Sequence, residues 1–203
     1  MYVTGNSKET YRFTEEYDKL PHEYNYKELI HICHNKKLNT IGDVKTDLSK
    51  SWYLKNSQDL ANGAIKTLQN NMYNFFRNVM KSKTSNNLWT CFSDYRNLLS
   101  GKGYAKGYIP SNARATNNYR TRTVIAYPIN KYMHTYVKTF FLANGVSVDE
   151  DGYALSEMLQ WIWRSAIRDG KEIWIYIPSR RMITLLENWI NENSPDVSLP
   201  LPA

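Results

Sequence analysis

Hydrophobic positions along the chain separate helical segments from one clear strand. Six apolar residues of segment 64–80 recur every three or four positions, which places them on one face of a helix. Residues 172–177 are instead β-branched and aromatic after Glu172, which predicts a strand. A last amphipathic helix is predicted after Pro178 and Ser179, running through Ile190. The helical face of the first segment consists of Ile65, Leu68, Met72, Phe75, Phe76 and Val79.

The remaining segments give shorter signals. Residues 88–92 form an apolar run typical of a buried strand, a brief helix is expected over 93–99, and a second strand is possible at 107–110. A short helix is expected over 25–35, and residues 123–143 read as a longer helix that Pro128 kinks or opens. Residues 153–168 predict another helix, and the acidic run 149–151 favours its N-terminal cap over a magnesium-binding motif.

Strands that alternate with helices of this length predict an α/β domain, with a mostly parallel sheet flanked by helices. The 203 residues suit one domain, which we expect over 48–203, after a helical N-terminal extension over 1–47. No run of about 18 apolar residues occurs, and the N-terminus lacks the apolar stretch of a signal peptide, so a cytoplasmic protein is expected. Two cysteines make no disulfide framework, and the cluster His31, Cys33, His34 is too small for a structural zinc site, so no metal is expected.

Positive charge is concentrated in the middle of the chain. Residues 60–148 carry twelve Lys or Arg and one acidic residue, whereas the flanking segments together carry fourteen and eighteen. The same segment holds fourteen aromatic residues. Because cations contact phosphates and rings stack on unpaired bases, the mixture suits single-stranded DNA or RNA. A charged surface over an aromatic core explains it equally well.

A polar stripe crosses the predicted helix 153–168. Gln160, Arg164 and Arg168 are spaced four residues apart, so they share one face of a helix that is otherwise apolar. Such arginines can neutralise charge on a nucleotide γ-phosphate or hold a backbone phosphate. An ordinary solvated helix face is the alternative.

Segment 154–182, ALSEMLQWIWRSAIRDGKEIWIYIPSRRM, resembles the last conserved block of superfamily 2 helicases carried by phages and mobile elements. Segment 101–119, GKGYAKGYIPSNARATNNY, is similar to a preceding block, and the resemblance extends over about residues 48–190. It implies a RecA-like second motor lobe. Gln160, Arg164 and Arg168 would then be the nucleotide-sensing residues, and Arg114, Thr116 and Asn117 would belong to the segment that contacts nucleic acid.

No G-x-x-x-x-G-K-[ST] loop occurs in the sequence, so no ATPase activity is expected of this chain alone. ATP and magnesium would be bound only with a first motor lobe supplied. The predicted function is therefore nucleic-acid binding by a helicase-like lobe, through Lys102, Lys106, Arg114, Thr116, Asn117, Arg120 and Arg122. Two alternatives remain open: a phage- or plasmid-borne inhibitor of a host defence system, of the anti-CRISPR type, that binds nucleic acid or the effector protein, and a small metal-dependent nuclease.

Overall fold

The central feature of the computed structural model is a four-stranded sheet in which every strand runs parallel to its neighbours. The strands lie in the order β3-β6-β5-β4. Their bounds are β3 Ile30–Ile32, β4 Asn87–Trp89, β5 Val124–Ala126 and β6 Ile173–Tyr176. The structure describes residues 2–6, 10–14, 24–58, 63–113 and 118–194. The predicted α/β class with a parallel sheet is thereby confirmed.

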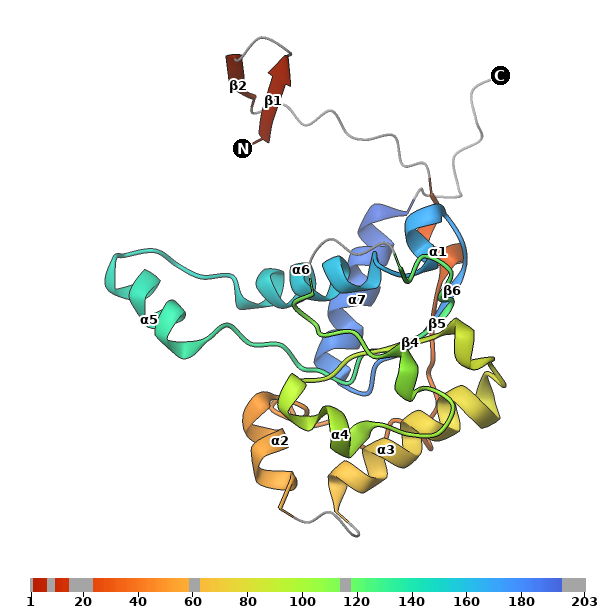
Figure 1. Cartoon of the computed structure of the whole chain (residues 1–203). Helices are drawn as coiled ribbons and strands as arrows, with labels where there is room; N and C mark the ends of the chain where they lie inside the picture. Colours follow the sequence, from red (N-terminus) through yellow and green to blue (C-terminus); the bar gives the residue numbers. More distant parts are fainter. Residues whose placement is uncertain (1, 7–9, 15–23, 59–62, 114–117, 195–203) are drawn as a thin grey trace, which may run out of the picture.

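Helices cover both faces of this sheet (Figure 1). One face packs against α1 (Tyr26–Leu29), α6 (Glu150–Ile162) and α7 (Arg180–Asn193). The other packs against α2 (Lys50–Asn56), α3 (Ala64–Asn74) with its π-helical continuation Phe75–Val79, and α4 (Arg96–Leu99). Successive residues of a strand point to opposite faces of the sheet. Ile125 therefore lies in the hydrophobic core beneath α6 and α7, and Ala126 lies in the core on the side of α2, α3 and α4.

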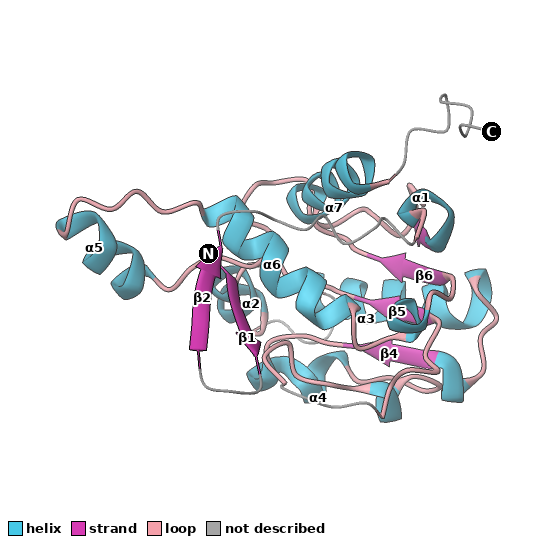
Figure 2. Cartoon of the chain, turned by 90° about the horizontal axis from the view of Figure 1, so that it is seen from above, coloured by secondary structure: helices cyan, strands magenta, loops and turns pink. Residues whose placement is uncertain are grey.

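Two further elements lie outside these layers. The backbone of β1 (Tyr2–Asn6) pairs antiparallel with β2 (Thr10–Thr14). Helix α5 (Thr135–Ala143) connects β5 to α6 and projects away from the sheet in both views (Figures 1 and 2). Short 3-10 turns at Thr84–Asn86, Ser93–Tyr95, Ala105–Gly107 and Ala166–Asp169 complete the described elements.

Four predictions of local structure are wrong, and one of them, the helix over 153–168, is described with the candidate interface. Residues 25–35 form α1 and then β3, so the sheet includes part of the segment assigned to the N-terminal extension. Residues 123–143 are not one helix, because β5 occupies 124–126 and α5 begins only at Thr135. Segment 107–110 is not a full strand either, since Tyr108 makes a single parallel bridge to Trp89. The predicted helices near 64–80, 93–99 and 180–190 and the strands near 88–92 and 172–177 are confirmed.

Candidate nucleic-acid interface

The amino edge of the sheet carries a surplus of basic residues. Because the strands are parallel, the segments that enter them meet at one edge. Segment 24–29 before β3 is neutral, with Lys27 and Glu28, and the other three are 77–86 before β4, 118–123 before β5 and 164–172 before β6. Segment 100–107 joins these three, since Tyr108 pairs alongside β4. These four segments contain two acidic residues, Asp169 and Glu172, and ten basic ones: Arg77, Lys81, Lys83, Lys102, Lys106, Arg120, Arg122, Arg164, Arg168 and Lys171.

The opposite, carboxyl edge is close to neutral. Its segments 33–50, 90–95, 127–134, 149–151 and 177–181 contain seven basic and six acidic residues. The positive charge of this fold is therefore a property of one edge, not of the whole surface.

Two accessible cations of the amino edge are on the loop 100–107. Lys102 and Lys106 are both exposed and line a cavity of about 650 Å3, together with Thr84 and the backbone between them. Among the described residues neither lysine forms an ion pair. Their charges are thus available to an anionic partner.

Buried Asn87 fixes the position of this loop. Its side-chain oxygen accepts a hydrogen bond from the Ser82 hydroxyl at 2.6 Å, and its amide donates to the Gly103 carbonyl at 2.9 Å. The loop then passes so close to β4 that a Cβ at Gly107 would lie 2.2 Å from the Asn87 carbonyl oxygen. The lysines are therefore held on a packed backbone next to the first residue of β4.

Arg120 and Arg122 are tied to neighbouring segments of the same edge. Arg122 donates to the Thr84 carbonyl at 2.9 Å and also to the Ser85 carbonyl. Arg120 binds the Asp169 carboxylate through two nitrogens, with Nε at 3.0 Å from Oδ1. This hydrogen-bonded pair raises the pKa of Arg120 and lowers the pKa of Asp169. Both arginines therefore organise the edge as well as adding charge to it.

The predicted stripe of Gln160, Arg164 and Arg168 is not on one helix, so that prediction is wrong. Helix α6 ends at Ile162, Arg164 lies in the turn that follows, and Arg168 is in a 3-10 turn. Two hydrogen bonds replace those of a continued helix. The Ser165 hydroxyl donates to the Ile162 carbonyl at 2.7 Å, and the Ala166 amide donates to the carbonyl of Arg122, just before β5.

These three residues nevertheless lie beside the basic edge. Gln160 is exposed and donates to the Ser156 hydroxyl, while Arg168 is exposed one residue before Asp169. Arg164 is half-buried, and desolvation lowers the pKa of its guanidinium. Their roles in nucleotide sensing stay predictions, as do those of Arg114, Thr116 and Asn117, which lie outside the described residues.

Few aromatic rings are exposed at the amino edge. Its four basic segments contain Tyr104, which is fully buried, and Tyr119, which is half-buried against the core. Six of the fourteen aromatic residues of the basic segment are core residues: Phe75, Phe76, Trp89, Tyr95, Tyr104 and Tyr127. The core interpretation therefore holds for these rings. The segment before β3 adds the exposed ring of Tyr24, which lies against Gly170.

A second cavity, of about 610 Å3, opens at the carboxyl ends of β4 and β5. The segment that follows β4 crosses one face of the sheet, and the segment that follows β5 crosses the opposite face. Parallel α/β folds form a crevice between two such strands. Its two lysines are already compensated, because Lys131 pairs with Glu157 at 3.0 Å and Lys50 lies 3.9 Å from Asp94. This cavity therefore lacks the charge surplus of the amino edge.

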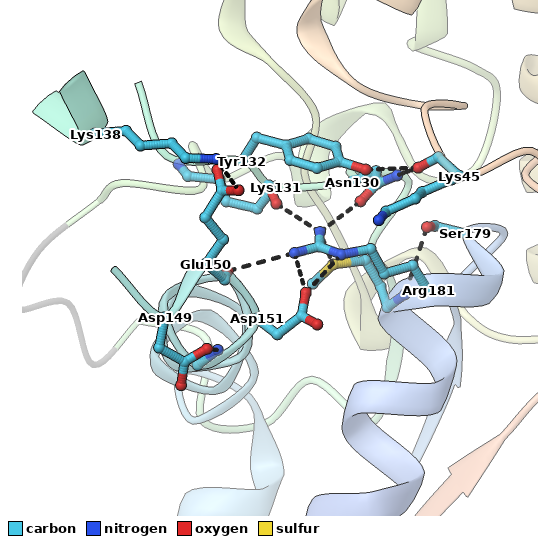
Figure 3. A network of polar contacts seen from close by, with 12 residues as sticks. Lys45, Asn130, Lys131, Tyr132, Lys138, Asp149, Glu150, Asp151, Ser179 and Arg181 are labelled. Carbon is cyan, nitrogen blue, oxygen red and sulfur yellow. Dashed lines mark hydrogen bonds and ion pairs between the residues drawn. The ribbon is translucent and has the colours of Figure 1, made fainter. Parts of the chain in front are cut away.

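The acidic run at the start of α6 is engaged in capping and ion pairs (Figure 3). Asp149 accepts a hydrogen bond from the Gly152 amide at 2.9 Å, which confirms the predicted helix cap. Glu150 binds Lys138 at 2.7 Å, and Asp151 binds Arg181 through Nε at 2.8 Å.

The described part of the chain contains no group of three or more His, Cys, Asp or Glu arranged to hold a metal. No described helix is long and apolar enough to cross a membrane.

Comparison with known proteins identifies a family and one relative. Residues 24–190 match the family described as the YonV C-terminal Rossmann-like domain. The chain belongs to this family. It is 46% identical over 153 residues to the SPbeta prophage-derived protein YonV of Bacillus subtilis (strain 168), a match that covers 75% of this chain. It spans only 36% of the length of that relative, and no solved structure matches. The family description supports a Rossmann-like fold and, at that coarser level, the α/β lobe expected from the sequence.

Proposed function

We propose that this chain binds nucleic acid, and that the amino edge of its sheet is the interface. The observation that carries the proposal is the meeting of four loop segments with ten basic and two acidic residues at one edge. Neutralising backbone phosphates releases the counterions condensed on the nucleic acid, which drives association without base contacts. The near-neutral carboxyl edge has no such driving force.

The four basic segments suit contacts with backbone phosphates better than base stacking. Base stacking on single strands needs exposed rings, and the two aromatic residues of these segments are buried or half-buried. The proposal therefore covers both duplex and single-stranded DNA or RNA, with Lys102 and Lys106 as the first phosphate contacts. In a helicase-like lobe Arg164 and Arg168 would instead sense a nucleotide on a separate first lobe. We assign Arg168 to phosphate contacts with the nucleic acid, because it lies on this edge.

Replacing Lys102 and Lys106 together by alanine is expected to weaken nucleic-acid binding by about tenfold at moderate salt. Each lost phosphate contact lowers the slope of log K against log salt by roughly 0.7–0.9, so the double variant should lose about 1.4–1.8 from that slope. Fluorescence anisotropy of labelled DNA and RNA, single-stranded and duplex, over a salt series measures both quantities.

Lys36→Ala with Lys37→Ala is the matched control. These two exposed lysines lie after β3, at the carboxyl edge, and their removal changes the net charge by the same amount. The control should keep the parent affinity and slope within about twofold. Equal losses in both double variants would mean that net charge, not the amino edge, drives binding, and an unchanged Lys102/Lys106 variant would reject this interface.

An inhibitor of a host defence system is the second candidate. It is favoured by one observation, the prophage-derived description of the relative. Such an inhibitor would bind the nucleic acid or the effector protein of the defence system. Absence of binding in the anisotropy experiment would reject the first candidate and leave an inhibitor that acts on the effector protein, because only that form of the second candidate needs no binding to nucleic acid.

A further inference from the structure

One face of helix α3 carries a row of exposed side chains that includes an aromatic ring. The spacing of these residues, four, three and four positions, places them on one face of α3 and of its π-helical continuation. We call this row the outer face of α3: Lys66, Asn70, Tyr73 and Arg77. The opposite face of the helix is buried in the core. Tyr73 is 39% exposed, so its ring lies at the surface between two cations.

The outer face of α3 lies beside the loop 100–107. The Lys66 ammonium donates to the Gln69 side-chain oxygen at 2.8 Å, and the Gln69 amide donates to the Ser100 carbonyl at 2.8 Å. At the other end of the row, a Cβ on Gly103 would lie 2.9 Å from Cδ of Arg77, so the Arg77 side chain rests on this loop. The row is therefore continuous with the two exposed lysines of the amino edge.

Almost no negative charge opposes the cations of this region. Residues 63–113, all of which the structure describes, contain seven basic residues and one acidic residue, Asp94. Asp94 follows β4 at the carboxyl edge, where it lies 3.9 Å from Lys50. Arg77 forms no ion pair with the described residues. This face therefore attracts a polyanion, and the ring within it adds a contact that a phosphate does not need.

We infer that Tyr73 stacks on an unpaired base, and that this contact makes the chain prefer single-stranded nucleic acid to duplex. The inference rests on the proposed function, because the cations of the amino edge hold the phosphates of the same strand. In a duplex the face of each base is covered by the neighbouring base pairs, whereas a single strand can present it to a ring. Proteins that bind single strands without sequence preference combine cations for the backbone with aromatic rings for the bases.

The geometry of the outer face suits one strand. Tyr73 and Arg77 are separated by about 6 Å along the helix axis, at 1.5 Å or so per residue. Successive phosphates of a stacked strand are about 3.4 Å apart along its axis, so a base on Tyr73 places a phosphate one or two positions away at Arg77. The backbone of Tyr73 is already fixed within α3, and a tyrosine side chain has only two rotatable bonds to order, so the contact costs little entropy.

Fluorescence anisotropy with two labelled probes tests this inference: an oligothymidylate of about 20 nucleotides, and a DNA duplex of the same length. The parent protein should bind the single strand more tightly than the duplex. Tyr73→Ala should weaken binding to the single strand by about 5- to 150-fold, the range for the loss of one stacked base. Its affinity for the duplex should stay within about twofold of the parent.

Two controls separate stacking from other effects of the substitution. Tyr73→Phe keeps the ring and should bind the single strand as the parent does. Tyr24→Ala removes a tyrosine of similar exposure, 37%, at the β3 end of the same edge, where segment 24–29 is neutral, and should also keep the parent affinity. Circular dichroism checks that each variant has the helix content of the parent. Because a stacked base releases no counterions, the salt slope of Tyr73→Ala should equal that of the parent.

The outcomes distinguish failure of this inference from failure of the proposed function. A parent protein that binds the duplex as tightly as the single strand overturns the stacking role of Tyr73. So does Tyr73→Ala if it loses nothing or loses equally on both probes, and so does an equal loss in Tyr24→Ala. In each of these cases salt-dependent binding that needs Lys102 and Lys106 would still support the proposed function. Absence of binding to both probes would overturn the two together.

Discussion

Gly42→Ala is expected to lower the free energy of unfolding by about 4 kcal/mol, through overpacking of about 1–3 kcal/mol and a left-handed backbone cost of about 1–2 kcal/mol. Gly42 has a φ of +110°, which L side chains rarely adopt. A Cβ there would lie 2.1 Å from the Pro178 carbonyl oxygen and 3.0 Å from the Ser179 Cα. Both neighbours are backbone atoms at the start of α7, so neither can rotate away. Urea unfolding followed by circular dichroism measures the loss.

Gly145→Ala separates the two causes. Gly145 also has a left-handed backbone, with a φ of +73°, but nothing lies within 4 Å of its Cβ position. Its substitution should therefore cost only the conformational part, about 1–2 kcal/mol at most. If Gly42→Ala costs no more than Gly145→Ala, the close contact between the β3–α2 connection and the start of α7 does not constrain the fold.

The sequence predicts the elements whose pattern is long or distinctive. Segment 64–80 repeats its apolar residues over four turns, which predicts a helix. Segment 172–177 is dominated by β-branched and aromatic residues, which predicts a strand. The final helix is confirmed for the same reason, and its Ser179 cap accepts a hydrogen bond from the Met182 amide.

The two strands that were not predicted, β3 and β5, are short, and pairing with neighbouring strands defines them. β3 and β5 have three residues each, and a short apolar run cannot be assigned by periodicity alone. Only pairing on both sides makes Val124–Ala126 a strand, since it lies between β4 and β6. A usable signal was Pro128, which forbids the interior of a helix and follows β5 by two residues.

The candidate interface was predicted in part. Lys102, Lys106, Arg120 and Arg122 all lie on the amino edge, but the sequence assigned them to one continuous basic segment. Lys171 was missed because it belongs to an acidic C-terminal segment. Lys81 and Lys83 were counted in the basic segment but were not named as site residues, because no motif contains them. Each of these lysines shortly precedes a strand, and in a parallel sheet such residues share an edge. That rule was available from the sequence, whereas the order of the strands was not.

Arg181→Met is expected to cost about 3 kcal/mol of unfolding free energy, since acceptors left unpaired in a buried site cost about 1–3 kcal/mol each. The Arg181 side chain is 11% exposed and donates to the Asn130 side-chain oxygen at 2.9 Å and to the Lys131 carbonyl at 2.8 Å. Its guanidinium also lies 4.5 Å from the centre of the Tyr132 ring (Figure 3). Methionine keeps most of the volume but offers no donor, so these acceptors, and the carboxylate of Asp151, lose their partner.

Arg180→Met tests whether that loss comes from the network rather than from the charge. Arg180 is the adjacent residue, and its ion pair with Asp43 is exposed on both sides, so its removal should change the unfolding free energy by less than about 0.5 kcal/mol. Urea unfolding of both variants, with the parent protein, gives the comparison. Equal effects of the two substitutions would contradict the role of Arg181. A selective loss would show that one largely buried guanidinium joins the start of α7 to the segment between β5 and α5, because Asn130 and Lys131 belong to that segment.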